Sequence, residues 1–317
     1  MATDGARRGL VRAAACLAAL ALGGCAQVAP LPEQGQSAAQ EAPGPVRWAE
    51  IMALPVPPPD HRLSYGEHPL QFGELRLPAG PGPHPVAVLL HGGCWRAEYD
   101  LEHVSHMGAA LARAGVAVWT PEYRRVGDEG GGWPGTFEDA ARAFAWLQAL
   151  AQDYPLDLDR VVLVGHSAGG HLALWLAGRH NLPAEHPLHA PGPLRVRGVV
   201  SLAGITDLVR YAEGERGCNA AVPLLMEGSP AEQPERYAAA SPIELLPLGV
   251  PVRLLQGAVD PIVKLEQASA FADRASAYAQ DVQVKLIEGA GHFDLIAPFA
   301  PAWPAVQAAV VELLAAD

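Results

Sequence analysis

Three residue types that together can cleave an acyl bond follow apolar segments in the second half of the chain. Ser167 is the centre of a Gly-x-Ser-x-Gly motif, and Asp260 and His292 each follow a later apolar segment. A serine hydroxyl is a poor nucleophile at neutral pH, so it needs a base to accept its proton and a third group to orient that base. The sequence therefore predicts Ser167 as nucleophile, His292 as base and Asp260 as the orienting acid.

The motif around Ser167 has the flanks of a sharp turn between a strand and a helix. An apolar run over 160–164 precedes it, and residues 170–177 resemble the start of a helix. Such a turn strains the backbone of the serine and lifts its hydroxyl above the sheet, and only tiny residues fit where strand and helix nearly touch. Gly165 and Gly169 meet that need. The motif alone is common by chance, so the prediction also depends on Asp260 and His292.

Other carboxylates compete with Asp260 for the role of the acid. Asp294 is two residues from His292 on the same loop, a poor position for reaching the imidazole ring, and Asp207 follows another apolar segment. Each could equally be an ordinary solvated loop acid. We favour Asp260 because it comes just past the end of the strand that neighbours the strand before His292.

An attacked carbonyl becomes an oxyanion, which needs N–H donors that already point at it. The N–H of Ala168, at the start of the predicted helix, is one expected donor. Gly92 or Gly93, directly after the apolar run 86–90, is expected to supply the other, since glycine lets the peptide turn its N–H toward a substrate.

Buried apolar segments alternate with amphipathic ones along most of the chain. We predict a strand pair within 62–78, strands over 86–90, 116–119, 160–164, 196–202, 250–255 and 282–287, and helices over 101–114, 137–151, 265–278 and 304–315. This alternation predicts an α/β fold, a mostly parallel sheet with helices on both faces and its active site at the carboxyl ends of the strands. Residues from about 208 to 248 interrupt the pattern and are predicted to be a small lid insertion.

The composition narrows the possible ligands. The chain has 317 residues, half of them apolar, with 22 basic against 34 acidic side chains. This acidic balance without a basic stripe argues against a nucleic-acid partner. No Cys or His spacing suggests a metal, and no cofactor is implied, so the expected partner is a small-molecule substrate.

The N-terminus resembles a bacterial lipoprotein signal. Arginines precede an apolar stretch that ends in Leu22-Gly23-Gly24-Cys25. We predict a signal peptide over 1–24, a lipid on Cys25, a flexible Pro/Ala/Gln-rich tether over 25–61 and a catalytic domain over 62–317. The protein would then be exported and face the periplasm or the cell exterior, touching the membrane only through its lipid. The alternatives are a secretory signal cut elsewhere and a retained anchor.

Two cysteines remain in the predicted catalytic domain. Cys94 and Cys218 could form a disulfide in an oxidising compartment, or they could be two separate buried thiols. The sequence leaves both possibilities open.

Together these residues resemble the α/β-hydrolase fold over roughly 62–315. The run His91-Gly92-Gly93-Cys94-Trp95 further resembles the H-G-G-x-W motif of arylformamidase-like (kynurenine formamidase-like) esterases, and the runs 122–125 (Glu-Tyr-Arg-Arg), 241–242 (Ser-Pro) and 291–296 fit that branch. The resemblance implies that Gly92 and Gly93 form the oxyanion hole and that Trp95 shapes the substrate pocket, beside which we also place His166. It implies a serine hydrolase acting on small carboxylic esters or N-formyl amides.

Two other functions are compatible with the same motifs. One is a peptidase-like α/β hydrolase, although such peptidases normally carry a propeller or another large domain for which this chain has no room. The other is a surface-anchored binding protein that kept the fold without the chemistry. The intact set of Ser167, Asp260 and His292 argues against the second alternative.

Overall fold

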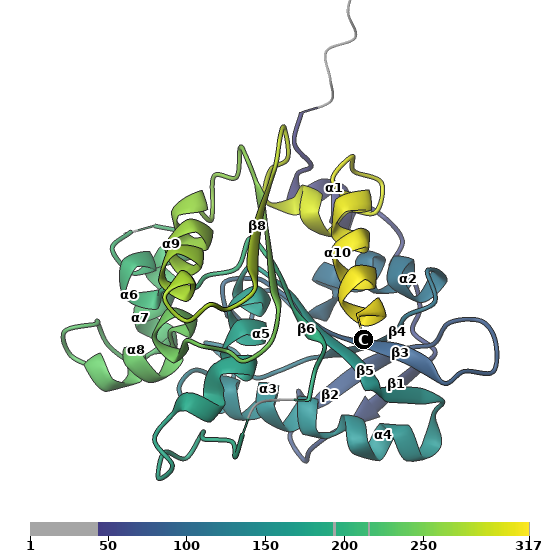
Figure 1. Ribbon diagram of the computed structural model, residues 1–317, viewed down its shortest axis with the longest axis horizontal. Helices are drawn as coiled ribbons and strands as arrows, with labels where there is room; N and C mark the ends of the chain where they lie inside the picture. Colours follow the sequence, from purple (N-terminus) through teal and green to yellow (C-terminus); the bar gives the residue numbers. More distant parts are fainter. Residues whose placement is uncertain (1–43, 193–194, 215, 317) are drawn as a thin grey trace, which may run out of the picture. The chain divides into compact units, whose positions relative to one another are not determined.

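A single sheet of eight strands organises the structure, a computed structural model that describes residues 44–192, 195–214 and 216–316 (Figure 1). The strands lie in the order β1-β2-β4-β3-β5-β6-β7-β8. Their bounds are β1 (His61–Ser64), β2 (Phe72–Arg76), β3 (His84–Leu90), β4 (Ala117–Pro121), β5 (Leu156–His166), β6 (Gly198–Leu202), β7 (Val252–Gly257) and β8 (Val282–Ile287). β2 pairs antiparallel with both β1 and β4, and all pairs from β4 to β8 are parallel.

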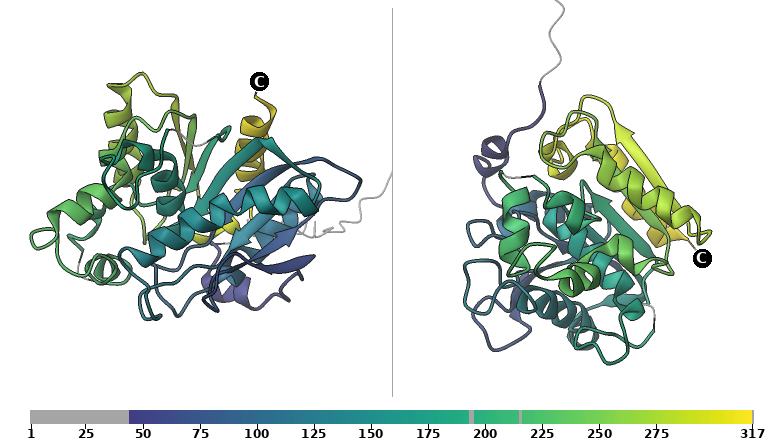
Figure 2. Two further views of the ribbon diagram at one scale, coloured as in Figure 1. Left: turned by 90° about the horizontal axis from the view of Figure 1, so that it is seen from below. Right: turned by 90° about the vertical axis from the view of Figure 1, so that its left-hand side faces the viewer.

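Helices cover both faces of this sheet (Figures 1 and 2). α2 and α10 lie on one face, and α3, α5 and α9 lie on the other. The α-helices are α1 (Trp48–Met52), α2 (Ser105–Arg113), α3 (Gly135–Ala145), α4 (Leu147–Asp153), α5 (Ala168–Gly178), α6 (Leu208–Tyr211), α7 (Val222–Leu225), α8 (Pro234–Ala240), α9 (Leu265–Ser276) and α10 (Trp303–Ala315). Short 3₁₀ helices are η1 (Leu101–Val104), η2 (Arg179–Asn181), η3 (Asn219–Ala221), η4 (Pro242–Leu245) and η5 (Phe293–Ile296).

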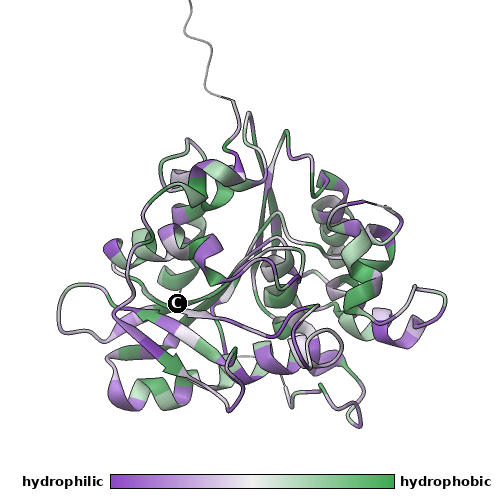
Figure 3. Ribbon diagram, turned by 180° about the vertical axis from the view of Figure 1, so that it is seen from behind, coloured by the Kyte–Doolittle hydropathy of each residue, from purple (hydrophilic) through white to green (hydrophobic). Residues whose placement is uncertain are grey.

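The core lies between the central strands and the helices that cover them. Residues 161–166 of β5 and every residue of β6 are buried, as expected for parallel strands covered on both faces. Every residue of α5 is buried too, which fits a helix that is apolar all round. The helices nearer the surface, by contrast, carry both hydrophilic and hydrophobic residues (Figure 3).

The architecture confirms the predicted α/β fold, with a mostly parallel sheet and helices on both faces. The expected insertion also lies between β6 and β7, where α6, η3, α7, α8 and η4 follow one another. The prediction of one helix over 137–151 is wrong, because this segment belongs to two helices, α3 and α4, which are separated at Trp146. Trp146 takes the C-cap of α3, and its indole is partly exposed instead of lying in the core.

The predicted tether over 25–61 is wrong in its second part. Residues from 44 on belong to the same compact unit as the sheet. Within them, α1 buries Ile51, the Arg76 guanidinium donates to the Pro57 carbonyl at 2.9 Å, and Asp60 accepts from the Leu77 N–H at 2.7 Å. The Pro-rich composition concealed these few apolar and polar anchors, which are enough to fix the segment.

Part of the N-terminal prediction lies outside the described residues. The signal peptide over 1–24, the lipid on Cys25 and the tether up to residue 43 belong to that part of the chain. Across residues 44–192, 195–214 and 216–316, no helix has both the length and the apolar character needed to cross a bilayer.

The close approach of β5 and α5 gives a testable prediction. A Cβ at Gly165 would lie far inside van der Waals contact with the backbone carbonyl of Gly169, which no side-chain motion relieves. We expect Gly165→Ala to lower the free energy of unfolding by about 3 kcal/mol or more in urea denaturation. Gly108→Ala in α2 is the matched control, because its Cβ would meet its nearest neighbour at an ordinary 3.6 Å. That change should stabilise by about 0.5–1 kcal/mol, and equal effects would contradict the close approach.

Candidate active site

Ser167 occupies the turn between β5 and α5 in a strained backbone conformation. Its φ is 55° and its ψ is −119°, a region that residues other than glycine rarely enter. The Ser167 N–H donates to the Leu202 carbonyl at 2.8 Å, and the Ser167 carbonyl accepts from the His171 N–H at 3.1 Å. These bonds to β6 and α5 hold the serine at the carboxyl end of the sheet.

Asp260 and His292 meet at the same end of the sheet, on the loops that follow β7 and β8. The Nδ1 of His292 lies 2.7 Å from Oδ2 of Asp260, and both side chains are buried. The other carboxylate oxygen, Oδ1, accepts from the N–H groups of Ile262 at 2.7 Å and Val263 at 3.0 Å. The sequence predicted this pair, and the structure brings it together.

The bonds around Asp260 determine the tautomer of His292. Burial raises the pKa of Asp260, but the hydrogen bond and charge of His292 and two backbone N–H groups outweigh burial and leave that pKa below its ordinary value. Asp260 is therefore a carboxylate that only accepts, and Nδ1 of His292 must donate to it. In the neutral ring with this tautomer, Nε2 of His292 carries the lone pair and can act as a base.

Ser167 and His292 line one cavity of about 190 Å³. Its other lining residues include Trp48, Tyr99, Ile262 and Phe293. Within the described part of the chain, neither the Ser167 hydroxyl nor Nε2 of His292 makes a hydrogen bond to another residue. Both groups are therefore available to a ligand in this cavity.

The two competing carboxylates have other partners. Oδ2 of Asp294 accepts from the N–H groups of Gly291 and Val46, each at 2.9 Å. Asp207 caps α6, where its Oδ1 accepts from the Arg210 N–H at 3.0 Å. Neither carboxylate bonds the His292 ring, so the geometry favours Asp260.

The loop after β3 bends back on itself beside Ser167. Gly93, Cys94 and Trp95 all have positive φ, at 101°, 54° and 57°. Gly93 lines the cavity with Ser167, whereas a Cβ on Gly92 would lie 3.0 Å from ring nitrogens of His103 and His166. Ala168 is the first residue of α5, where the N–H has no acceptor within the helix.

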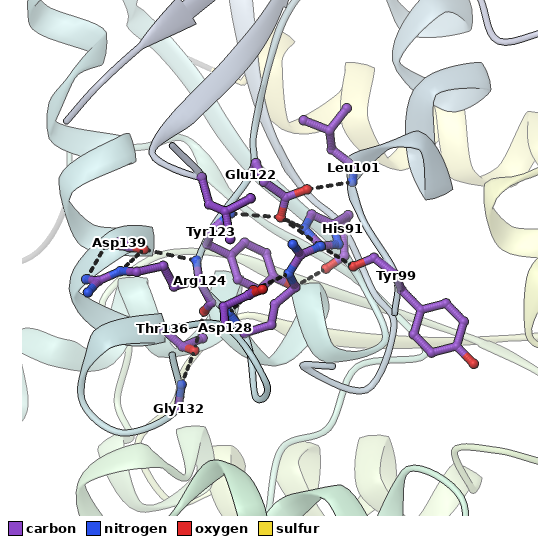
Figure 4. A network of polar contacts seen from close by, with 12 residues as sticks. His91, Tyr99, Leu101, Glu122, Tyr123, Arg124, Asp128, Gly132, Thr136 and Asp139 are labelled. Carbon is purple, nitrogen blue, oxygen red and sulfur yellow. Dashed lines mark hydrogen bonds and ion pairs between the residues drawn. The ribbon is translucent and has the colours of Figure 1, made fainter. Parts of the chain in front are cut away.

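A buried polar network supports this loop from behind (Figure 4). The ring nitrogens of His91 each lie 2.8 Å from an acceptor, the Gly92 carbonyl and Oε1 of Glu122. Burial raises the pKa of Glu122, but the charge and hydrogen bond of His91 and the charge of Arg125 bring that pKa below its ordinary value. Glu122 is thus a carboxylate, and Nε2 of His91 donates to it. The Tyr123 ring stacks on the His91 ring at 4.3 Å.

The next two arginines extend the network to neighbouring segments (Figure 4). Arg124 pairs with Asp139 of α3 at 2.7 Å, and Arg125 pairs with Asp128 at 3.0 Å and also donates to the Tyr99 carbonyl. The sequence pattern by itself assigns these residues no role. The signal was present, because four consecutive polar or aromatic residues directly follow a buried strand.

A second chain of hydrogen bonds connects buried histidines to His292. Nε2 of His166 lies 3.0 Å from the His292 carbonyl, which only accepts, so Nε2 donates and Nδ1 of His166 is an acceptor. His103 supplies the donor from its Nε2 at 2.7 Å. Burial, followed by repulsion from nearby histidines, holds the pKa of both His103 and His166 well below the ordinary value. His166 therefore holds the backbone of His292 in place.

Trp95 and His166 were expected at the substrate pocket, and the structure contradicts this expectation. Both side chains are fully buried, and neither lines the cavity with Ser167. The Trp95 indole N–H donates to Nδ1 of His171 at 3.2 Å, and Nε2 of His171 donates to the Ala240 carbonyl at 2.9 Å. Trp95 thus connects the loop after β3 to α5 and, through His171, to the insertion. Its left-handed backbone turns its side chain into the core instead of the cavity.

Cys94 and Cys218 form a disulfide whose Cα atoms are 4.9 Å apart. Both residues line the cavity with Ser167. The bond joins the loop after β3 to the start of the insertion, so these two segments form one continuous wall. Among the described residues, no group of three or more His, Cys, Asp and Glu side chains is arranged to hold a metal ion.

Comparisons with known proteins give similar esterases. The BD-FAE family model matches residues 75–274. Esterase LipC of Mycobacterium tuberculosis is 28% identical over 248 residues, which are 74% of this chain and 60% of LipC. The probable carboxylic ester hydrolase LipM of the same organism is 28% identical over 74% of this chain and 55% of its own length. The chain therefore spans less than two thirds of the length of these curated relatives.

Solved structures share the fold at lower sequence identity. A truncated carbohydrate esterase from gut microbiota superimposes with a TM-score of 0.68 at 20% identity, covering 80% of this chain and 95% of that one. Esterase B from Lactobacillus Rhamnosis also gives a TM-score of 0.68 at 20% identity, covering 80% of this chain and 83% of its own. These likenesses confirm the α/β-hydrolase fold.

The buried His171 makes stability depend on pH. Burial lowers the pKa of His171 from 6.5 to about 4, so the unfolded chain takes up a proton before the folded one as the pH falls. The free energy of unfolding should therefore decrease below pH 6.5, and His171 should contribute about 2 kcal/mol of the loss between pH 7 and pH 5. His171→Gln, which can keep both hydrogen bonds but cannot titrate, should remove that share. Urea denaturation at the two pH values measures it, and an unchanged difference would contradict the assignment.

Proposed function

The chain belongs to the BD-FAE family of α/β-hydrolase esterases, and from this premise we propose that it hydrolyses small carboxylic esters through a covalent acyl-enzyme. One observation carries the proposal. The 2.7 Å bond between Asp260 and His292 lies at the cavity into which Ser167 faces, with the serine backbone at a φ of 55°. A nucleophile, a base and an orienting acid gathered at one end of the sheet are the requirements for acyl transfer.

The proposed reaction assigns one task to each side chain. Oγ of Ser167 attacks the ester carbonyl while Nε2 of His292 accepts the hydroxyl proton. Asp260 stabilises the imidazolium that forms, and His292 then gives the proton to the departing alcohol. In the second half of the cycle His292 activates a water molecule, which attacks the acyl group and releases Ser167.

The oxyanion of each tetrahedral intermediate would accept hydrogen bonds from two backbone N–H groups. Gly93 on the cavity wall and Ala168 at the start of α5 are the proposed donors, and the start of a helix also favours negative charge. Each such donor contributes about 3–4 kcal/mol to transition-state stabilisation. The network of His91 and Glu122 supports this role, because it fixes the loop that carries Gly93.

N-formyl amides are a second proposed substrate class. The likeness of 91–95 and 122–125 to motifs of arylformamidase-like esterases supports it. The two runs are hydrogen-bonded to each other, through His91 with Glu122 and Tyr123. A cavity of about 190 Å³ suits a small acyl group such as formyl or acetyl. The chemistry would be the same acyl transfer with an amine as leaving group.

We also propose that the protein is an exported lipoprotein that is anchored through Cys25. The arginines, the apolar stretch and Leu22-Gly23-Gly24-Cys25 support this. The disulfide between Cys94 and Cys218 supports it too, because disulfides persist in oxidising compartments outside the cytosol.

Replacing the nucleophile tests the function. Ser167→Ala should abolish turnover of p-nitrophenyl acetate and N-formylkynurenine and should abolish labelling by a fluorophosphonate probe, because no acyl-enzyme can form. The control is Ser201→Ala, a buried serine whose hydroxyl has no hydrogen-bond partner among the described residues. It should retain activity. Turnover that persists in Ser167→Ala would refute the nucleophile, and an unreactive wild type would favour the binding-protein alternative.

Replacing the acid tests the arrangement around His292. Asp260→Asn should lower kcat for p-nitrophenyl acetate by about 10⁴-fold, because an amide no longer holds Nδ1–H and Nε2 as a free base. Asp207→Asn is the matched control, since asparagine also caps helices and, among the described residues, the Asp207 carboxylate bonds only the start of α6. Steady-state kinetics of both variants measure the loss of kcat, and circular dichroism spectra check that both are folded. Equal losses of kcat would exclude Asp260 as the orienting acid.

A further inference from the structure

A second cavity, of about 260 Å³, adjoins the cavity that holds Ser167. The two cavities share Trp48, Ile262, His292 and Phe293 as lining residues. The remaining lining of the second cavity includes residues 45–47, which precede α1. We call residues 45–48 the N-terminal strap. The strap lies before the segment 75–274 that the family model matches.

Trp48 is held beside the catalytic residues by aromatic contacts. Its ring centroid lies 4.8 Å from that of His103 and 5.6 Å from those of Tyr99 and Phe293. Trp48 remains only half-buried, because it also faces both cavities. The strap supplies Trp48 and the insertion supplies Cys218 to the lining of the cavity around Ser167.

The strap is bonded to the loop that carries His292. The buried Oδ2 of Asp294 accepts from the N–H of Val46 in the strap and from the N–H of Gly291, each at 2.9 Å. One carboxylate oxygen thus fixes the strap and the histidine loop to each other. The position of the strap is therefore defined relative to His292.

The lining of the second cavity is apolar apart from His292 and Arg47, and one of its lining residues, Val259, is 53% exposed. Arg47 turns its side chain outward, where Glu50 pairs with it at 3.3 Å. An apolar group that entered would cover Val259, Ile262 and the Trp48 ring. Such coverage is the source of hydrophobic affinity.

The position of His292 indicates which half of an ester would occupy this cavity. In acyl transfer the histidine hands its proton to the leaving oxygen, so the alcohol must begin within hydrogen-bond reach of His292. The acyl carbon instead stays bonded to Ser167, among Gly93, Cys94 and Cys218. A chain that extends from the leaving oxygen past His292 meets Phe293 and Trp48, which border the second cavity.

We propose that the N-terminal strap forms an alcohol subsite, in which Trp48 and the second cavity bind an apolar leaving alcohol of the ester. This inference rests on the proposed esterase function and adds the substrate class: esters of a short acid with an extended apolar alcohol. It also makes Trp48 a residue that determines specificity.

Two ester series separate the two halves of the site. Acetates of ethanol, butanol and hexanol lengthen the alcohol, and ethyl acetate, butyrate and hexanoate lengthen the acid. In the wild type, kcat/KM should rise about threefold for each added alcohol methylene. Trp48→Ala should reduce the gain from ethyl to hexyl acetate at least tenfold and should reduce the gain along the acid series much less. Trp48→Phe, which keeps an aromatic ring, should recover most of the gain.

Trp146→Ala is the matched control, because this partly exposed tryptophan lies between α3 and α4 and lines neither cavity. Equal losses in both series, losses in the acid series alone, or no loss in the alcohol series would overturn the proposal. Binding of 1-hexanol to full-length Ser167→Ala protein, followed by ligand-observed NMR, is independent of turnover. Its dissociation constant should rise at least tenfold when Trp48→Ala is added. An unchanged constant refutes the subsite even if the chain proves not to be an esterase.

Discussion

The closeness of β5, α5 and the end of β3 is the constraint on which the site depends. Side-chain atoms at Gly165 or Gly169 would collide with backbone carbonyls of α5 or β3, so the three segments can meet only because neither residue has a Cβ. Their meeting forces Ser167 into its left-handed conformation and places its hydroxyl at the cavity. Strain of this kind persists only where the surrounding packing determines the backbone, and here the fully buried α5 provides that packing.

Around this turn, buried histidines act as fixed donors and acceptors. His91 lies between Glu122 and a carbonyl, whereas His166 and His171 are held neutral, each donating from Nε2 to a carbonyl. Each bond leads to a segment that must stay in place: the loop after β3, the backbone of His292 and the insertion. In a low-dielectric interior such bonds are strong and an unpaired polar group is costly, so the network favours one arrangement of these loops.

The pattern of the sequence predicts the sheet, most helices and the pairing of Asp260 with His292, because apolar periodicity and strand-end loops are local features. It does not predict the strap, since a proline-rich composition indicates a tether, and the strap is held by distant partners such as Tyr99 and Phe293. Trp95 shows a second limit. Its motif indicates a place near the active site, but the direction of its side chain depends on a left-handed backbone that no spacing reveals.

The disulfide has a mechanical consequence for access to the site. It closes a loop across 124 positions of the chain and ties the first part of the insertion to the strand-end loop that bears Gly93. That side of the entrance cannot swing open while the covalent bond persists. Any widening of the cavity must then come from other lining segments, among them the strap, which the Val46 N–H bond to Asp294 and the ring contacts of Trp48 hold beside the histidine loop. A reducing environment would remove this difference, because the loop after β3 and the insertion could then move apart.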